Sequence, residues 1–185
     1  NYVCVYTNGE SINNEYYKYP DFTSNLSDRK WVFDNVSGGK FSCVIWNHIY
    51  KSDFLLGKQI KFLDSRTLCS EDGVFFMEVY SQITKLSTIP DYLYYHVFHQ
   101  TNTGKSIAYR SIQNRMAFFE NIYQVLRANN IDEEEALSYL SQNVMTSLYS
   151  GARLTLIHLP LKQAFREIRQ IGENDLIMKS IDRVY

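Results

Sequence analysis

Apolar and polar residues alternate in short blocks over the first part of this chain, up to about residue 105. Runs rich in Tyr, Phe, Trp, Val and Ile are broken by clusters of Asn, Gly, Ser and Asp, a texture typical of strands and loops with a few helices. The opening run NYVCVYT is β-prone and predicts a strand. The aromatic run PDYLYYHVF, which starts at Pro90, predicts another.

Helical spacing begins in the middle of the chain. In the run EDGVFFMEVYSQITKL, apolar residues occupy positions 75, 76, 79, 80 and 83. Glu71 and Asp72 should therefore lie at or just before the N-terminus of a helix. The preceding run CVIWNHIYKSDFLLGKQIKF predicts a strand edge and then a short helix that ends at Gly57.

From Ser106 onward the pattern predicts long helices. The first has apolar residues at helical spacing and ends at the two asparagines 129 and 130. The second starts at Asp132, where Glu135 completes a capping-box-like sequence, and we expect it to end at Gly151. The third is the amphipathic stretch LKQAFREIRQIGENDLIMKSIDRVY, which carries the basic residues Lys162, Arg166 and Arg169.

Composition and charge narrow the class of protein. The chain has 185 residues, 45% of them hydrophobic and 21% charged, which is typical of a globular protein. Its formal net charge of −1 gives no overall attraction to nucleic acid, so nucleic acid is not an expected partner. The three cysteines, Cys4, Cys43 and Cys69, are too scattered for a disulfide framework and fit a reducing compartment.

Membrane-spanning and secretory segments of a sequence indicate where in the cell the protein is found. No apolar run approaches the roughly 20 residues that span a bilayer, and the first residues lack a secretory signal pattern. We therefore expect a cytoplasmic protein. The chain opens on Asn1 without a methionine, so we expect that it does not begin where its gene begins.

Common catalytic signatures do not occur in the sequence. It contains no G-x-x-x-x-G-K-[ST], GxGxxG or GxSxG run, so P-loop, dinucleotide-binding and hydrolase interpretations lack support. His96 and His99 form an HxxH pair, but two residues at that spacing on a strand point to opposite faces. The pair therefore does not predict a metal site.

The acid pair at positions 71 and 72 has two interpretations. A carboxylate at a helix N-terminus accepts free backbone N–H groups and is stabilised by the helix dipole, which is a purely structural role. An ionised, fixed Asp72 that faces a cleft can instead act as a general base, a role that typically contributes about 10²- to 10⁴-fold to a rate. Position in the sequence does not decide between them.

A resemblance over roughly residues 1 to 106 favours the second interpretation. The segment WNHIYKSDFL precedes IKF, then the ED pair before an aromatic and apolar helix, then IPDYLYYH. In this order the motifs resemble the C-terminal half of bacterial family 2 glycosyltransferases of the GT-A fold. The resemblance implies an α/β fold: an incomplete GT-A-like, Rossmann-like acceptor half with mixed strands in residues 1–105, followed by an α-helical C-terminal tail in residues 106–185.

The same resemblance implies roles for individual residues. Asp72 would be the catalytic base, which deprotonates an acceptor hydroxyl as it attacks the anomeric carbon of a nucleotide sugar with inversion. Glu71 would shape the acceptor pocket or the helix cap. Trp46 would line the sugar or acceptor cleft with Asn47 nearby, and His96 would lie near the donor phosphates.

Two departures from the family pattern affect these expectations. His48 stands where the family more often has lysine. The family also binds a divalent metal, Mg or Mn, through a D-x-D motif, because a diphosphate leaving group needs charge neutralisation. No D-x-D occurs in this chain, so it has no metal ligands of its own from that motif. We therefore expect the metal in the full-length enzyme, and we expect this chain alone to be inactive.

Two functions remain open on the sequence alone. In the first, the chain is the acceptor-side half of a transferase for surface polysaccharide or lipid-linked glycan, with a nucleotide-sugar donor and a saccharide or lipid-linked acceptor as partners. In the second, it is a non-catalytic saccharide-binding or oligomerisation module derived from a transferase. The helical tail should pack against the domain or form a homodimer. Peripheral contact with the inner face of the cell membrane is the alternative for its basic residues.

Overall fold

The structure is a computed structural model. It describes residues 2–6, 11–16, 22–25, 45–64, 68, 70–88, 91, 94–98 and 112–183, and for residues 2–6, 11–16, 22–25 and 95–98 it describes the backbone alone. Cys43, Cys69 and His99 lie outside these ranges.

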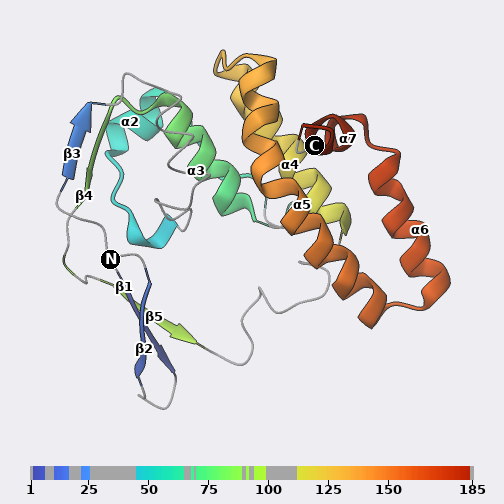
Figure 1. Cartoon of the computed structure of the whole chain (residues 1–185). Helices are drawn as coiled ribbons and strands as arrows, with labels where there is room; N and C mark the ends of the chain where they lie inside the picture. Colours follow the sequence, from blue (N-terminus) through green and yellow to red (C-terminus); the bar gives the residue numbers. More distant parts are fainter. Residues whose placement is uncertain are drawn as a thin grey trace.

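Helices make up most of the described chain. In sequence order they are the 3-10 helix η1 (Ile45–Asn47), α2 (Ser52–Gly57), α3 (Glu71–Gln82), α4 (Ile112–Ala128), α5 (Glu133–His158), α6 (Leu161–Gly172) and α7 (Asp175–Ile181). Helices α4 to α7 form one bundle, and α3 packs against α4 at its edge (Figure 1).

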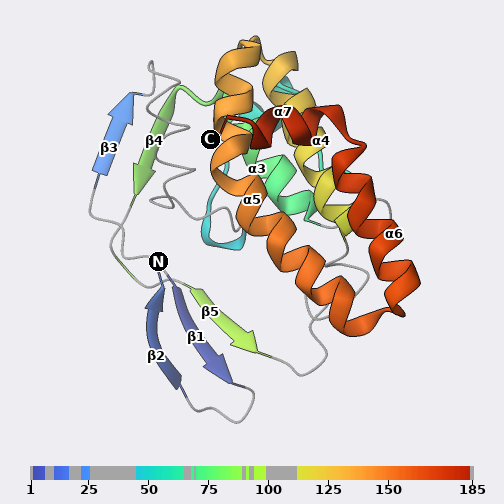
Figure 2. The same cartoon turned by 45° about the vertical axis from the view of Figure 1, so that its right-hand side comes forward.

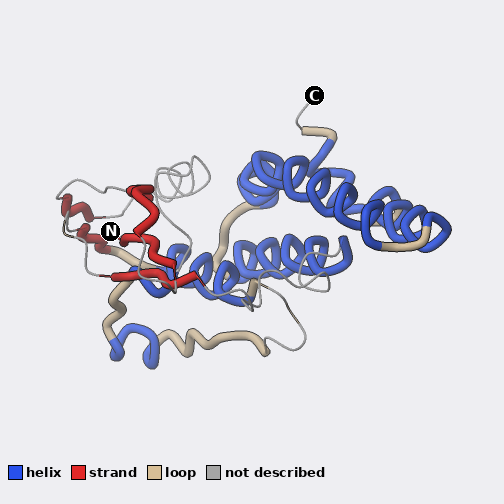
Figure 3. Tube along the Cα trace, turned by 90° about the horizontal axis from the view of Figure 1, so that it is seen from below, coloured by secondary structure: helices blue, strands red, loops and turns tan. Residues whose placement is uncertain are grey.

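The described strands form two small sheets. In the first, β1 (Tyr2–Tyr6) lies between β2 (Ser11–Tyr16), which is antiparallel to it, and β5 (Tyr94–Phe98), which is parallel to it. In the second, β3 (Phe22–Asn25) pairs antiparallel with β4 (Lys85–Thr88). Figure 2 shows the first sheet beyond one end of the helical bundle, and Figure 3 shows the strands gathered on one side of the molecule.

The expected α/β fold, an incomplete GT-A-like and Rossmann-like half, is wrong. A Rossmann-like fold is a mostly parallel sheet with helices on both faces. The described chain is instead mostly helical, its strands are short, and they are divided between two sheets. The physical reason is that the helices bury their apolar stripes against one another: α4 packs on both α3 and α5, and α5 packs on α6 and α7.

Several individual elements agree with the sequence pattern. β1 and β5 confirm the two predicted strands, and α2 ends at Gly57 as expected. The predicted helix begins at Glu71, and the residues at its predicted apolar positions 75, 76, 79 and 80 are buried. Asp132 caps α5, because its Oδ1 accepts a hydrogen bond from the backbone N–H of Glu135 at 2.7 Å.

Two predicted helix ends are wrong. Helix α5 continues through Gly151 to His158. Gly151 is buried against α4, where an added Cβ would lie 2.7 Å from Cδ of Arg115, so the glycine permits a close approach of two helices. The predicted third helix is divided into α6 and α7, and Asn174 caps α7 by accepting a hydrogen bond from the N–H of Ile177 at 3.1 Å.

The hydrophobic core runs through α3, α4, α5 and α7. Its side chains with 1% or less of their surface exposed include Phe76, Tyr80, Ile112, Ile122, Leu126, Leu140, Val144 and Ile177. This buried cluster contains residues from both sides of the predicted boundary at residues 105 and 106, so α3 is anchored to the C-terminal helices. The boundary itself stays a prediction.

Candidate functional site

Glu71 and Asp72 form the first turn of α3. Ser70, just before them, has a φ of 73°, in the left-handed region that residues other than glycine rarely adopt, so the chain turns sharply into the helix. Asp72 is half-buried, and its Oδ1 accepts a hydrogen bond from the backbone N–H of Gly73 at 2.8 Å. Within the described ranges Asp72 has no other hydrogen bond and no ion pair. Its Oδ2 accepts no hydrogen bond from the described residues.

The helix that carries Asp72 is held firmly. Gly73 lies against α4, where an added Cβ would come within 2.8 Å of Cε2 of Phe118. Phe75 and Phe76 follow Gly73 by two and three residues, and both side chains are buried. The same helix carries a third carboxylate, Glu78, and burial raises the pKa of this group above its usual value. A carboxylate on such a packed helix keeps its position when a ligand binds.

Trp46 and Asn47 lie on the 3-10 helix η1. The ring of Trp46 stacks on the ring of Tyr94 from β5, with 4.6 Å between ring centroids and 23° between the planes. Both polar atoms of the Asn47 side chain are buried, and neither has a hydrogen-bond partner among the described residues. An amide in this state costs free energy unless a ligand or water satisfies it. The Asn47 side chain therefore has hydrogen-bonding capacity that the described residues leave unused.

The segment that contains Trp46 packs along α3. The ring of His48 lies edge-on to the ring of Phe76, at 5.5 Å between centroids, and the ring of Tyr50 lies edge-on to Phe75, also at 5.5 Å. Phe76 is four residues after Asp72, which is about one helical turn. The structure thus brings the WNHIY segment and the helix of the acid pair together. The roles of the individual residues stay predictions.

His96 lies in the middle of β5, where its Cα is paired with that of Cys4 in β1. The structure describes only the backbone of His96, so the predicted place of its side chain near the donor phosphates stays a prediction. Its strand also carries Tyr94, the stacking partner of Trp46. Backbone pairing therefore links β5 to β1, and the aromatic stack links it to η1.

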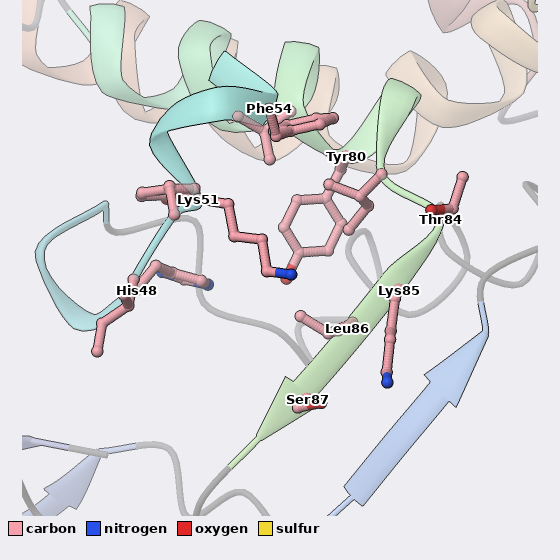
Figure 4. A pocket seen from close by; sticks show the side chains of 12 residues that line it. His48, Lys51, Phe54, Tyr80, Thr84, Lys85, Leu86 and Ser87 are labelled. Carbon is pink, nitrogen blue, oxygen red and sulfur yellow. The ribbon is translucent and has the colours of Figure 1, made fainter. Parts of the chain in front are cut away.

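A pocket of about 480 Å³ lies at the opposite end of α3 from the acid pair. Its walls come from residues 48–51, Phe54 of α2, the last turns of α3 and strand β4 (Figure 4). Figure 4 shows the side chains of Lys51 and Tyr80 extending into the space between the 48–51 segment and β4. Tyr80 is eight residues after Asp72, which corresponds to about 12 Å along a helix axis. The pocket is therefore separate from the acid pair.

The pocket combines aromatic walls with cationic and hydroxyl groups. Its lining residues are His48, Ile49, Tyr50, Lys51, Phe54, Val79, Tyr80, Ile83, Thr84, Lys85, Leu86 and Ser87. Burial raises the pKa of the Tyr50 hydroxyl above its ordinary value, so this group stays protonated. Sequence reasoning missed the pocket because two separate segments, residues 48–54 and 79–87, build it, and the spacing of residues within either segment does not indicate that they meet.

Ligands for the divalent metal that the resemblance implies do not come together here. Within the part of the chain that the structure describes, no group of three or more His, Cys, Asp or Glu side chains is placed to hold a metal ion. The described residues therefore offer no ligand set for that metal. Across the same residues, no helix combines the length and apolar character needed to cross a membrane.

Comparison with known proteins adds no family to these observations. No protein-family model, no curated protein and no solved structure matches this chain.

Proposed function

We propose that this chain carries the acceptor side of an inverting glycosyltransferase, which moves a sugar from a nucleotide sugar to a hydroxyl group of a saccharide or lipid-linked acceptor. The proposal concerns the chemistry of the site and does not include a Rossmann-like fold, since one chemistry recurs on unrelated folds. It extends to surface polysaccharide or lipid-linked glycan synthesis, at the cytoplasmic side of the membrane.

The packing of the WNHIY segment along α3 carries this proposal. Through the contacts of His48 with Phe76 and of Tyr50 with Phe75, the segment with Trp46 and Asn47 lies beside the helix that begins with the acid pair. These are the two motifs whose order in the sequence suggests a transferase.

Asp72 would act as the general base of the reaction. Its Oδ1 is held by the N–H of Gly73, so Oδ2 accepts the proton of the acceptor hydroxyl. The hydroxyl oxygen forms a bond to the anomeric carbon while the bond from that carbon to the nucleotide diphosphate breaks, and the diphosphate leaves with the bonding electrons. Inversion results, because the attack and the departure occur on opposite faces of the sugar.

The other predicted site residues would bind the substrates. By the resemblance to the transferase family, Trp46 would stack on a sugar ring and Asn47 would bind its hydroxyls. Glu71 would shape the acceptor side of the first turn, and His96 would lie near the donor phosphates. The same aromatic stack and amide would also serve a non-catalytic saccharide-binding module, which differs by its lack of turnover.

Replacing Trp46 by alanine tests the acceptor side of this proposal. Loss of a stacking face worth about 1–2 kcal/mol should raise the KM for the acceptor roughly 5- to 30-fold and leave the KM for the donor unchanged. Initial rates would be measured on the protein as its cell expresses it, with a panel of nucleotide sugars and alkyl glycosides as acceptors. Tyr149→Ala, which removes an exposed ring from α5, is the matched control. An unchanged acceptor KM in Trp46→Ala would exclude this role.

A further inference from the structure

Exposed apolar side chains gather where α5 ends and α6 begins. Four of the ten large apolar residues that are exposed in the described part of the chain lie here: Leu156, Ile157, Leu161 and Phe165. Ile157, Leu161 and Phe165 have 61%, 65% and 63% of their surface exposed, respectively. Single exposed apolar residues are normal on protein surfaces, but a contiguous group marks an interaction site. We name these four residues the α5–α6 corner.

Helix α6 places this apolar surface beside a basic one. Leu161 and Phe165 are four residues apart and share one stripe of the helix, while Ala164 and Ile168 face inward. Lys162 and Arg166, also four residues apart, form the neighbouring stripe and are both exposed. Among the described residues, neither of these two cations takes part in an ion pair, whereas Arg169 is paired with Glu173 at 3.0 Å.

A hollow lies between the two cations. It has a volume of about 300 Å³ and is lined by Pro160, Lys162, Gln163 and Arg166. The carbon chains of Lys162 and Arg166 line this hollow, so the two cationic side chains lie on either side of it, on the same helix as the exposed Leu161 and Phe165. A phosphate head group and its acyl chains present the matching features, negative charge and apolar surface, side by side.

We propose that the α5–α6 corner docks on the surface of a membrane that contains anionic phospholipids. The apolar side chains of Leu156, Ile157, Leu161 and Phe165 enter the boundary between head groups and acyl chains, and Lys162 and Arg166 bind lipid phosphates. Helix α6 lies in the plane of the interface, as amphipathic helices with a basic flank do. This docking does not depend on the role proposed for Asp72.

Charge argues against a second copy of the chain as the occupant. In a symmetric dimer through the corner, Lys162 and Arg166 of both copies would border the same interface. Like charges placed together disfavour such an interface. An anionic lipid surface supplies the opposite charge to Lys162 and Arg166, which lie beside the corner.

Co-sedimentation with lipid vesicles tests this docking. The full chain should bind vesicles of phosphatidylcholine and phosphatidylglycerol at a ratio of about 3:1 and should not bind vesicles of phosphatidylcholine alone. Replacing both cations, as Lys162→Gln with Arg166→Gln, should weaken binding to the anionic vesicles by about 30-fold. Leu161→Ser with Phe165→Ser should also weaken it at least roughly tenfold, because the apolar contact is lost.

A matched double variant controls for net charge. Lys58→Gln with Lys61→Gln removes two exposed cations near α2 and should bind like the unaltered protein. All the altered side chains are exposed, so each variant should fold. Thermal unfolding checks this. Equal binding to neutral and anionic vesicles, or undiminished binding by the Lys162 and Arg166 double variant, would overturn the proposal. So would a dimer in sedimentation velocity that Phe165→Ser dissociates, because a second copy would then cover the corner.

Discussion

Replacing Asp72 by asparagine is expected to slow sugar transfer by about 10²- to 10⁴-fold, because an amide cannot take the proton of the acceptor hydroxyl. The asparagine has nearly the same shape, and its amide oxygen can still accept the hydrogen bond from the N–H of Gly73. Folding should therefore change little. Initial rates at saturating acceptor, together with thermal unfolding, measure both quantities on the protein as its cell expresses it.

Asp175→Asn is the matched control for this substitution. Asp175 also lies in the first turn of a helix, α7, so its carboxylate has the same relation to the helix dipole. It is exposed and should affect neither transfer nor, beyond about a few tenths of a kcal/mol, stability. Turnover by Asp72→Asn that equals the unaltered rate would remove Asp72 as the base. Saccharide binding without turnover in the unaltered protein would favour the non-catalytic module.

Replacing Phe76 by alanine should destabilise the folded protein by about 3–5 kcal/mol, since it leaves a cavity in a well-packed core. Only 1% of the Phe76 surface is exposed. Its ring lies 4.1 Å from that of Tyr80 and 5.5 Å from that of His48, measured between centroids. The substitution therefore also loosens the WNHIY segment. Urea denaturation monitored by circular dichroism gives the free energy of unfolding.

The same substitution at an exposed phenylalanine provides the comparison. Phe165→Ala removes a ring that is 63% exposed on α6, and the free energy of unfolding should stay within about 0.5 kcal/mol of the unaltered value. A loss below about 1 kcal/mol in Phe76→Ala would contradict the burial of this ring between α3 and the 45–50 segment.

Local features of the fold could be predicted from the sequence. The start of α3 at Glu71 is indicated by the spacing of its apolar residues, and the cap of α5 is indicated by Asp132 and Glu135. Both signals lie within a few residues of the structure that they determine. The strands β1 and β5 could be predicted from their β-prone composition for the same reason.

The fold class could not be predicted in this way, because it depends on contacts between distant residues. Glycine often marks the end of a helix. Gly151 nevertheless lies inside α5, where it packs against Arg115 of α4. The apolar stripe of α4 is buried equally well by a sheet or by helices, and its spacing does not say which. The α/β fold was implied by the resemblance of short motifs, which do not determine whether helices pack on a sheet or, as observed, on other helices.

In the candidate site, too, local features could be predicted from the sequence and contacts between distant residues could not. The acid pair at the start of α3 could be found, because a helix start and two adjacent acids are visible in one short run. The packing of His48 on Phe76, the stacking of Trp46 on Tyr94 and the pocket around Tyr80 all join separate segments. No signal within a single run of residues reports such contacts.

The most direct test of the proposed function is the anomeric configuration of a transfer product. The protein as its cell expresses it would be incubated with nucleotide sugars and alkyl glycoside acceptors, and the anomeric proton of the product would be monitored by ¹H NMR from the first minutes. A product of configuration opposite to that of the donor, formed by the unaltered protein and not by Asp72→Asn, is the predicted result. A product with retained configuration, or inverted product formed equally by Asp72→Asn, would contradict a single displacement with Asp72 as its base.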